Sequence, residues 1–304
     1  MNKGLRRDEI LEVELELTGT CNLDCPLCLR SYEGAQHLVQ KHVRPVAEII
    51  AQLNTFPSLQ FVCMAGSVSE PTMYKDFVPL LKYLVGRNIK IELYTNGNTR
   101  TTKWWEEIGK IFAPTDRVYF TVCGSTQELH EIYRVNSSLA QILRNASHFR
   151  KNGNCNDWIQ HIRFEYNAED LESAAMQAIM DQFSNRLLID SSPYQERFGI
   201  IKEETTIKMF GKLGEKYNTI KTSVLKRYES GASCKMRCKS FETKFLSINQ
   251  FGEEFPCFLY RVYKKTPFDH NDYTDIHKFE YDFCYECESL TTSILERNGM
   301  ERMV

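Results

Sequence analysis

Three cysteines near the N-terminus, Cys21, Cys25 and Cys28, are the residues of this chain best suited to chemistry. They stand in the run CNLDCPLC, directly after alternating apolar residues within Leu11–Leu17, so three sulfurs can converge on one short loop. A structural zinc site normally has four protein ligands, and the nearest histidine here is His37. Three thiolates with one open coordination position therefore favour an iron–sulfur cluster, with a zinc loop as the alternative.

A second set of cysteines lies near the other end of the chain. Cys238 and Cys257 flank Gly252, and the C-x2-C pair of Cys284 and Cys287 follows them. Four thiolates are enough to close a cubane iron–sulfur cluster or a zinc site, and the number of ligands does not separate the two metals. The sequence therefore predicts two metal centres far apart in the chain.

The composition limits the class of protein. The chain has 304 residues, of which 42% are hydrophobic, and a net charge of −2 without a Lys/Arg-rich run, which argues against a nucleic-acid partner. Its apolar runs are too short to span a bilayer, and its N-terminus lacks the apolar region of a signal peptide. We expect a cytoplasmic protein without a membrane partner, whose eleven cysteines serve metals or catalysis rather than disulfides.

Strand-like and helix-like segments alternate through the first two thirds of the chain, which is typical of βα units around a parallel sheet. The six predicted strands are Leu11–Leu17, Leu59–Met64, Lys90–Tyr94, Val118–Val122, Ile159–Tyr166 and Leu187–Asp190. The predicted helices are Pro45–Leu53, Tyr74–Val85, Lys103–Phe112, Leu139–Asn152 and Ala168–Phe183. In such folds the chemistry gathers at the carboxyl ends of the strands, and the cysteine triplet lies just past the first of them.

The last third of the chain has a different pattern. Helical periodicity predicts a bridging helix over 201–232, and the apolar residues around Asn249–Gly252 predict a short β-hairpin. We therefore expect a barrel domain at 1–200, the bridging helix, and a small cluster-binding domain at 233–304.

The cysteine triplet, together with the segments described next, resembles the hallmark of the radical S-adenosylmethionine (SAM) superfamily. The resemblance implies an α/β fold, a partial (β/α)6 TIM-like barrel, and a [4Fe-4S] cluster on Cys21, Cys25 and Cys28 whose unique iron chelates SAM. Reduction by a flavodoxin- or ferredoxin-type donor then cleaves SAM to a 5′-deoxyadenosyl radical, which abstracts hydrogen from the substrate.

Two segments after the second and third strands are similar to motifs of that family. Ala65–Pro71 resembles its Gly-Gly-Glu-Pro segment, which implies that Ser69 and Glu70 receive the SAM amine, although Val68 and Ser69 replace the two glycines. The Thr-Asn-Gly run around Asn96 resembles a segment at the barrel mouth. A helix N-terminal charge at Glu70 and a plain turn at Asn96 are the structural alternatives.

Four further residues follow from the same resemblance. Thr121 would contact the SAM ribose or carboxylate, Arg134 would hold a carboxylate, Asn167 would bond the ribose or adenine, and Leu27 would cover the adenine face. Cys123 stands where the family usually has Asp, and it serves either as a hydrogen donor facing the cavity or as packing.

The C-terminal cysteines resemble the auxiliary-cluster domain of the SPASM and twitch groups, in the shorter, twitch-like form. The resemblance implies an auxiliary [4Fe-4S] cluster on Cys238, Cys257, Cys284 and Cys287, with Cys234 as a spare thiol. A cluster whose irons are all bound by thiolates favours electron transfer.

We therefore expect a radical SAM oxidoreductase or maturase-type enzyme acting on a small molecule or peptide, in a net oxidation or a cross-linking reaction. The alternatives are a radical SAM epimerase or carbon–carbon bond former, and a non-enzymatic zinc or iron–sulfur scaffold.

Overall fold

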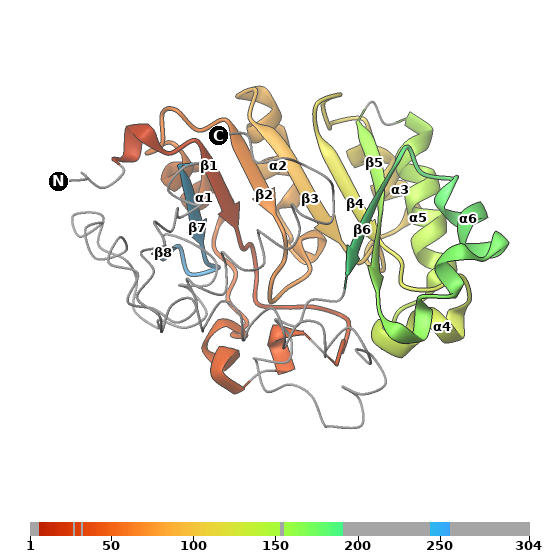
Figure 1. Cartoon of the computed structure of the whole chain (residues 1–304). Helices are drawn as coiled ribbons and strands as arrows, with labels where there is room; N and C mark the ends of the chain where they lie inside the picture. Colours follow the sequence, from red (N-terminus) through yellow and green to blue (C-terminus); the bar gives the residue numbers. More distant parts are fainter. Residues whose placement is uncertain (1–5, 27, 32, 153–154, 191–243, 256–304) are drawn as a thin grey trace, which may run out of the picture.

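The computed structural model describes residues 6–26, 28–31, 33–152, 155–190 and 244–255. Its centre is an eight-stranded sheet in the order β6-β5-β4-β3-β2-β1-β7-β8, and every pair of neighbours is parallel except β7 and β8 (Figure 1). The strands are β1 Glu12–Leu15, β2 Phe61–Met64, β3 Lys90–Thr95, β4 Arg117–Thr121, β5 Asn156–Arg163, β6 Asn185–Asp190, β7 Phe245–Ile248 and β8 Glu254–Phe255. All six strands predicted for the barrel region are confirmed, and the α/β fold has the mostly parallel sheet expected of it.

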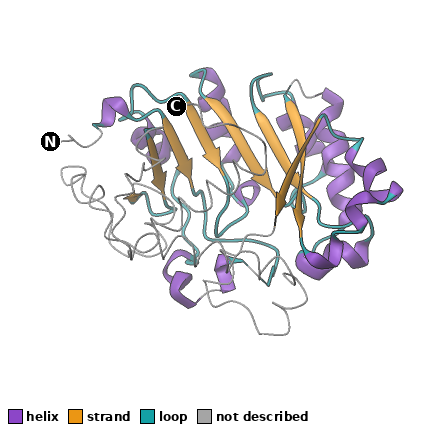
Figure 2. Cartoon of the chain, in the orientation of Figure 1, coloured by secondary structure: helices purple, strands orange, loops and turns teal. Residues whose placement is uncertain are grey.

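The described α-helices lie on one side of the sheet (Figure 2). They are α1 Val46–Leu53, α2 Phe77–Gly86, α3 Thr102–Gly109, α4 Gln127–Tyr133, α5 Leu139–Asn152 and α6 Ala174–Met180. Short 3-10 helices join them at η1 Arg7–Glu9, η2 Leu29–Ser31, η3 Glu33–Leu38, η4 Pro71–Met73, η5 Glu165–Asn167 and η6 Asp170–Glu172. None of the helices in these described ranges is long and apolar enough to cross a membrane.

The predicted helices were placed correctly but some of their ends were wrong. Pro45 is the N-cap of α1 rather than part of its first turn, because its ψ of 139° is extended. Within the segment predicted as one helix over Ala168–Phe183, only Ala174–Met180 is α-helical, and a 3-10 turn at Asp170–Glu172 precedes it. The sequence analysis missed α4, whose N-cap Thr126 accepts a hydrogen bond from the Leu129 N–H.

Alternation along the strands gives the sheet two different faces. Val13, Val62, Ile91 and Val118, which are fully buried, belong to the apolar core that also includes the buried residues of the helices. Residues one position away on each strand face the other side, because successive side chains of a strand alternate. These include Glu14, Cys63, Glu92 and Arg117, which lie in register across β1 to β4.

The hairpin predicted in the last third is present, but its first strand belongs to the main sheet. β7 pairs with β1 in parallel, and β8 turns back antiparallel to it. The predicted boundaries at 200/201 and 232/233 and the bridging helix at 201–232 lie outside the described residues.

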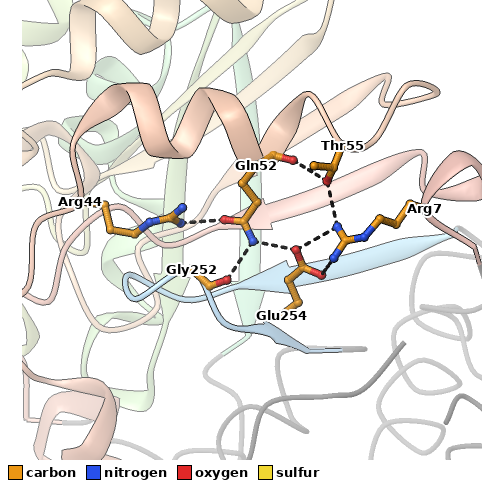
Figure 3. A network of polar contacts seen from close by, with 6 residues as sticks. All are labelled: Arg7, Arg44, Gln52, Thr55, Gly252 and Glu254. Carbon is orange, nitrogen blue, oxygen red and sulfur yellow. Dashed lines mark hydrogen bonds and ion pairs between the residues drawn. The ribbon is translucent and has the colours of Figure 1, made fainter. Parts of the chain in front are cut away.

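A network of polar contacts holds this hairpin against the N-terminal part of the chain (Figure 3). Gln52 of α1 donates to the Gly252 carbonyl at 2.8 Å and to Glu254 Oε1 at 2.7 Å, and it accepts from Arg44 at 2.7 Å. Arg7 forms a two-pronged ion pair with Glu254 at 3.0 and 3.2 Å. Segments that are up to 247 positions apart in the sequence are thereby fixed together.

Gly252 within this hairpin has a backbone conformation that explains its residue type. Its φ is +85°, which side-chain-bearing residues rarely adopt, and a Cβ there would lie 2.7 Å from the Arg44 guanidinium. The glycine between Cys238 and Cys257 is therefore required by the local fold.

Candidate functional site

The cysteine triplet lies on the loop after β1, at the edge of the sheet where the parallel strands end (Figure 1). Cys21, Cys25 and Cys28 join one side-chain cluster, which also contains buried Leu23, Cys123, Tyr133 and Phe164. The loop is held by the Asp24 N–H, which donates to the Val135 carbonyl at 3.2 Å, and by the Cys28 N–H, which donates to the Cys25 carbonyl at 3.1 Å. Leu27, predicted to cover adenine, lies outside the described residues.

Burial keeps the Cys21 and Cys28 thiols of this loop protonated at neutral pH when no metal is bound. Burial raises the pKa of Cys21 to about 11, against the opposing effect of the hydrogen bond from the Leu23 N–H. Burial likewise raises the pKa of Cys28 to about 12. Iron or zinc would therefore have to displace protons when it binds.

Two side chains donate hydrogen bonds to sulfur atoms of the triplet. Asn96, just after β3, reaches Cys21 Sγ from its Nδ2 at 3.8 Å, and Arg134, just after α4, reaches Cys25 Sγ from Nη1 at 3.6 Å. Such N–H donors favour sulfur that carries negative charge, as in a thiolate bound to iron. The donor set thus fits an iron–sulfur cluster, although no three His, Cys, Asp or Glu side chains in the described part already stand in a metal-ligating arrangement.

Glu70, predicted to receive the SAM amine, is buried in a network of its own. Its carboxylate accepts hydrogen bonds from the Thr72 N–H at 3.1 Å, Thr72 Oγ1 at 2.6 Å, Thr95 Oγ1 at 2.7 Å and the Asn96 N–H at 2.8 Å. Burial raises the pKa of Glu70, although these four donors oppose the change. Glu70 therefore fixes the loop after β2 to the end of β3 and so positions Asn96 beside Cys21; its contact with SAM stays a prediction.

Ser69 lies beside a second buried carboxylate. Its hydroxyl donates to Glu16, a residue just after β1 that is 2% exposed, and the Val68 N–H donates to the same carboxylate at 3.4 Å. The segment 65–71 is thus tied to the end of β1, next to the start of the cysteine loop.

Thr121 and Asn167 are both buried and both bonded within the protein. Thr121 Oγ1 donates to Gln160 Oε1 of β5 at 2.7 Å. Asn167 donates both amide hydrogens, to the carbonyls of Cys123 at 2.9 Å and Ile162 at 3.0 Å. In this structure they connect the ends of β4 and β5, and their roles in cofactor binding stay predictions.

The sequence analysis missed Arg30, two residues after the triplet. Its Nη1 donates to the carbonyls of Gly19 at 2.7 Å and Val68 at 2.6 Å, which joins the cysteine loop to the segment 65–71. A cation two residues after the last cysteine was the available signal, but the hydrogen-bond partners of Arg30 are backbone atoms that a sequence pattern does not reveal.

The sequence analysis also missed His130, whose ring bonds to Cys123, a member of the side-chain cluster around the triplet. It is fully buried; its Nδ1 accepts from the Cys123 N–H at 3.1 Å, and its Nε2 lies 2.7 Å from Ser137 Oγ. Because Nδ1 accepts, Nε2 carries the proton and donates to Ser137. Burial, with a smaller effect from Arg134, lowers the pKa of His130 to about 3, so the ring is neutral.

The predicted auxiliary ligands Cys238, Cys257, Cys284 and Cys287, and the spare Cys234, lie outside the described residues. Gly252, the glycine of their motif, is described and lies at the turn of the β7–β8 hairpin.

Comparisons with known proteins agree with this arrangement. In sequence, the chain is 26% identical over 109 residues to the tungsten-containing aldehyde ferredoxin oxidoreductase cofactor-modifying protein of Pyrococcus furiosus, a match of 36% of this chain and 29% of that protein. It is 27% identical over 176 residues to the mycofactocin maturase MftC of Mycobacterium ulcerans, a match of 57% of this chain and 45% of that protein. The chain thus spans less than half the length of these curated relatives.

The fold is similar to that of a protein solved with a bound precursor peptide. The structure of Streptococcus suis SuiB bound to precursor peptide SuiA aligns with a TM-score of 0.59 at 14% identity, over 92% of this chain and 66% of that chain. Residues 15–175, which contain the triplet, Glu70, Asn96, Thr121, Arg134 and Asn167, match the sequence family of the Radical SAM superfamily. The chain therefore belongs to the radical SAM superfamily.

Proposed function

We propose that this radical SAM enzyme abstracts a hydrogen atom from a peptide or small-molecule substrate in a maturase-type oxidation or cross-linking reaction. The observation that carries the proposal is the gathering of Cys21, Cys25 and Cys28 in one side-chain cluster, with N–H donors at two of the three sulfurs. When bound, the [4Fe-4S] cluster and SAM supply one-electron reduction and a 5′-deoxyadenosyl radical. A flavodoxin- or ferredoxin-type protein is the proposed electron donor.

The residues around the triplet have complementary tasks in this proposal. Asn96 and Arg134 hold two of the ligands and offset their negative charge, while the Glu70 network keeps Asn96 in place. Leu23, Tyr133 and Phe164 are almost fully buried beside the sulfurs and exclude water from the inner side of the site. Exclusion of water matters because a carbon radical must meet only its intended hydrogen donor.

Two of the similar proteins support the proposal, one through a maturase activity and the other through a bound peptide. MftC is named a mycofactocin maturase, and SuiB was solved with a precursor peptide. A net oxidation further requires an acceptor for the electron that leaves the substrate radical after hydrogen abstraction. We assign this role to an auxiliary [4Fe-4S] cluster on Cys238, Cys257, Cys284 and Cys287, in a twitch-like domain over 233–304.

The proposal is tested by anaerobic reconstitution with iron and sulfide, followed by dithionite and SAM. We expect about eight irons per chain if both clusters are cubanes, and formation of 5′-deoxyadenosine measured by mass spectrometry. Cys25→Ala should reduce 5′-deoxyadenosine to background, whereas Cys63→Ala, on β2 outside the triplet, should leave it unchanged. Zinc in place of iron, or a fully loaded protein that does not cleave SAM, would overturn the proposal in favour of a scaffold.

A further inference from the structure

Arg134 has an unusual set of partners for an arginine inside a protein. Its Nη1 donates to Cys25 Sγ at 3.6 Å, its Nε is buried without any hydrogen-bond partner, and its guanidinium carbon lies 5.3 Å from the centre of the Tyr133 ring. Within the described residues, Arg134 forms no ion pair with a carboxylate, unlike Arg7, Arg117 and Arg150. Arg134 is only half-buried, but its Nε is shielded from water, and the groups that interact with its charge include the sulfurs of Cys25 and Cys123.

The two sulfurs near Arg134 belong to residues that follow different strands of the sheet. Cys25 belongs to the triplet loop after β1, and buried Cys123 follows β4. Burial lowers the pKa of Arg134, but interactions with Cys25 first and Cys123 second outweigh it, so its pKa lies above the usual value.

The backbone fixes Arg134 and Cys123 through one residue. The Arg134 N–H donates to the His130 carbonyl at 3.1 Å, and the Cys123 N–H donates to His130 Nδ1 at 3.1 Å. The Cys123 carbonyl is in turn bonded by Asn167. These bonds fix the backbone position from which the Arg134 side chain extends to Cys25.

We propose that Arg134 is a positioning residue that raises the reduction potential of the barrel cluster through its hydrogen bond to the Cys25 ligand. This inference rests on the proposed cluster at the triplet. Reduction adds one negative charge to the cluster, and a fixed cation with an N–H directed at a ligand sulfur stabilises that charge more than it stabilises the oxidised state. Asn96 gives Cys21 a neutral donor at a longer distance, so its effect is smaller.

The test is a redox titration of the reconstituted cluster, followed by electron paramagnetic resonance, in the wild-type protein and three variants. Arg134→Met removes charge and donor, Arg134→Gln keeps an N–H without the charge, and Arg134→Lys keeps the charge without the planar fork. We expect Arg134→Met to lower the equilibrium constant for reduction at least tenfold, which is about 59 mV for a one-electron couple. The potentials of Arg134→Gln and Arg134→Lys should lie between those of the wild type and Arg134→Met. Arg144→Met, an exposed arginine of α5, is the matched control and should not change the potential.

The outcomes separate this inference from the proposed function. If the wild-type protein binds no iron at the triplet, the proposed function fails before Arg134 is tested. If the variants load iron like the wild type and keep its potential, the inference on Arg134 is overturned while the proposed function stands. If Arg134→Met fails to fold, the Arg134→Gln and Arg134→Lys variants are compared with the wild type instead. An unchanged reduction potential in both variants overturns the inference.

Discussion

Two polar networks join distant parts of this chain, and they differ in the atoms that their side chains contact. In the network that holds the β7–β8 hairpin, Arg7 pairs with Glu254, and Gln52 donates to two oxygens and accepts from the Arg44 guanidinium. In the network behind the cysteine loop, Asn96 and Arg134 end on sulfur, and Arg134 Nε has no partner. The side chains of the first network bond to one another, whereas the second ends at the cysteines that we propose bind a cluster. The difference distinguishes polar residues that support the fold from those to which we assign a role in the chemistry.

The largest effect on stability is expected at Glu70, which supports the fold and also positions Asn96 beside Cys21. Glu70→Ala removes an acceptor of four hydrogen bonds and leaves buried donors of Thr72, Thr95 and Asn96 unsatisfied. We expect a loss of about 3 kcal/mol in the free energy of unfolding, measured by urea denaturation. Glu107→Ala, at an exposed position of α3, is the control and should change it by less than about 0.5 kcal/mol. An equally small change in both variants would show that the Glu70 network does not support the fold.

A moderate effect is expected in the hairpin network. Gln52→Ala removes its bonds to Arg44, the Gly252 carbonyl and Glu254, and should lower the free energy of unfolding by about 2 kcal/mol. Amide hydrogen exchange at 245–255 should accelerate, while 5′-deoxyadenosine formation persists, since the cysteine loop is not part of this network. Gln60→Ala, at an exposed position before β2, provides the baseline. Loss of SAM cleavage in Gln52→Ala with the cluster intact would contradict the separation of the two networks.

The smallest expected effect is a pH dependence of the free energy of unfolding, which arises from His130 behind the cysteine loop. His130, whose pKa burial lowers to about 3, takes up a proton near its ordinary value of 6.5 only after unfolding. The unfolded state therefore binds more protons below pH 6.5, and stability falls as pH falls toward 3. Between pH 6.5 and 5.5 the expected loss is about 1 kcal/mol. His161, whose pKa burial also lowers, adds a loss of the same sign.

Thermal unfolding over this pH range measures the effect. His130→Gln should show a weaker pH dependence than the wild type, whatever its absolute stability. His42→Gln, at an exposed position, should keep the wild-type dependence. The idea would fail if His130→Gln retained the whole slope.

Much of the fold could be predicted because alternation and helical periodicity are local signals. All six strands predicted within residues 11–190 and the hairpin were found, since each is a short apolar run between polar segments. The pairing of β7 with β1 was missed because a hairpin pattern identifies its two strands but not their partner in the sheet. α4 was missed because its sequence, QELHEIY, is short and mostly polar, and its start depends on the Thr126 cap.

The candidate site shows the same limit. The triplet is visible from spacing alone, because its three residues lie on one loop. The contact of Arg134 with Cys25 joins residues 109 positions apart, and the bonds of Arg30 end on backbone carbonyls. Such contacts depend on how the loops after β1, β2 and β4 meet, which only the folded structure defines.

The parallel pairing of β1 with β7 also sets an order of assembly. β1 is complete at Leu15, but the strand that covers its outer edge begins at Phe245. A loop of this length must close before the pairing contacts form, and such non-local closure slows folding. During synthesis β1 therefore remains an edge strand until late, with backbone groups available for intermolecular pairing. A chain cut before residue 245 would keep that edge open, so the hairpin, once formed, covers an edge that could otherwise pair between molecules.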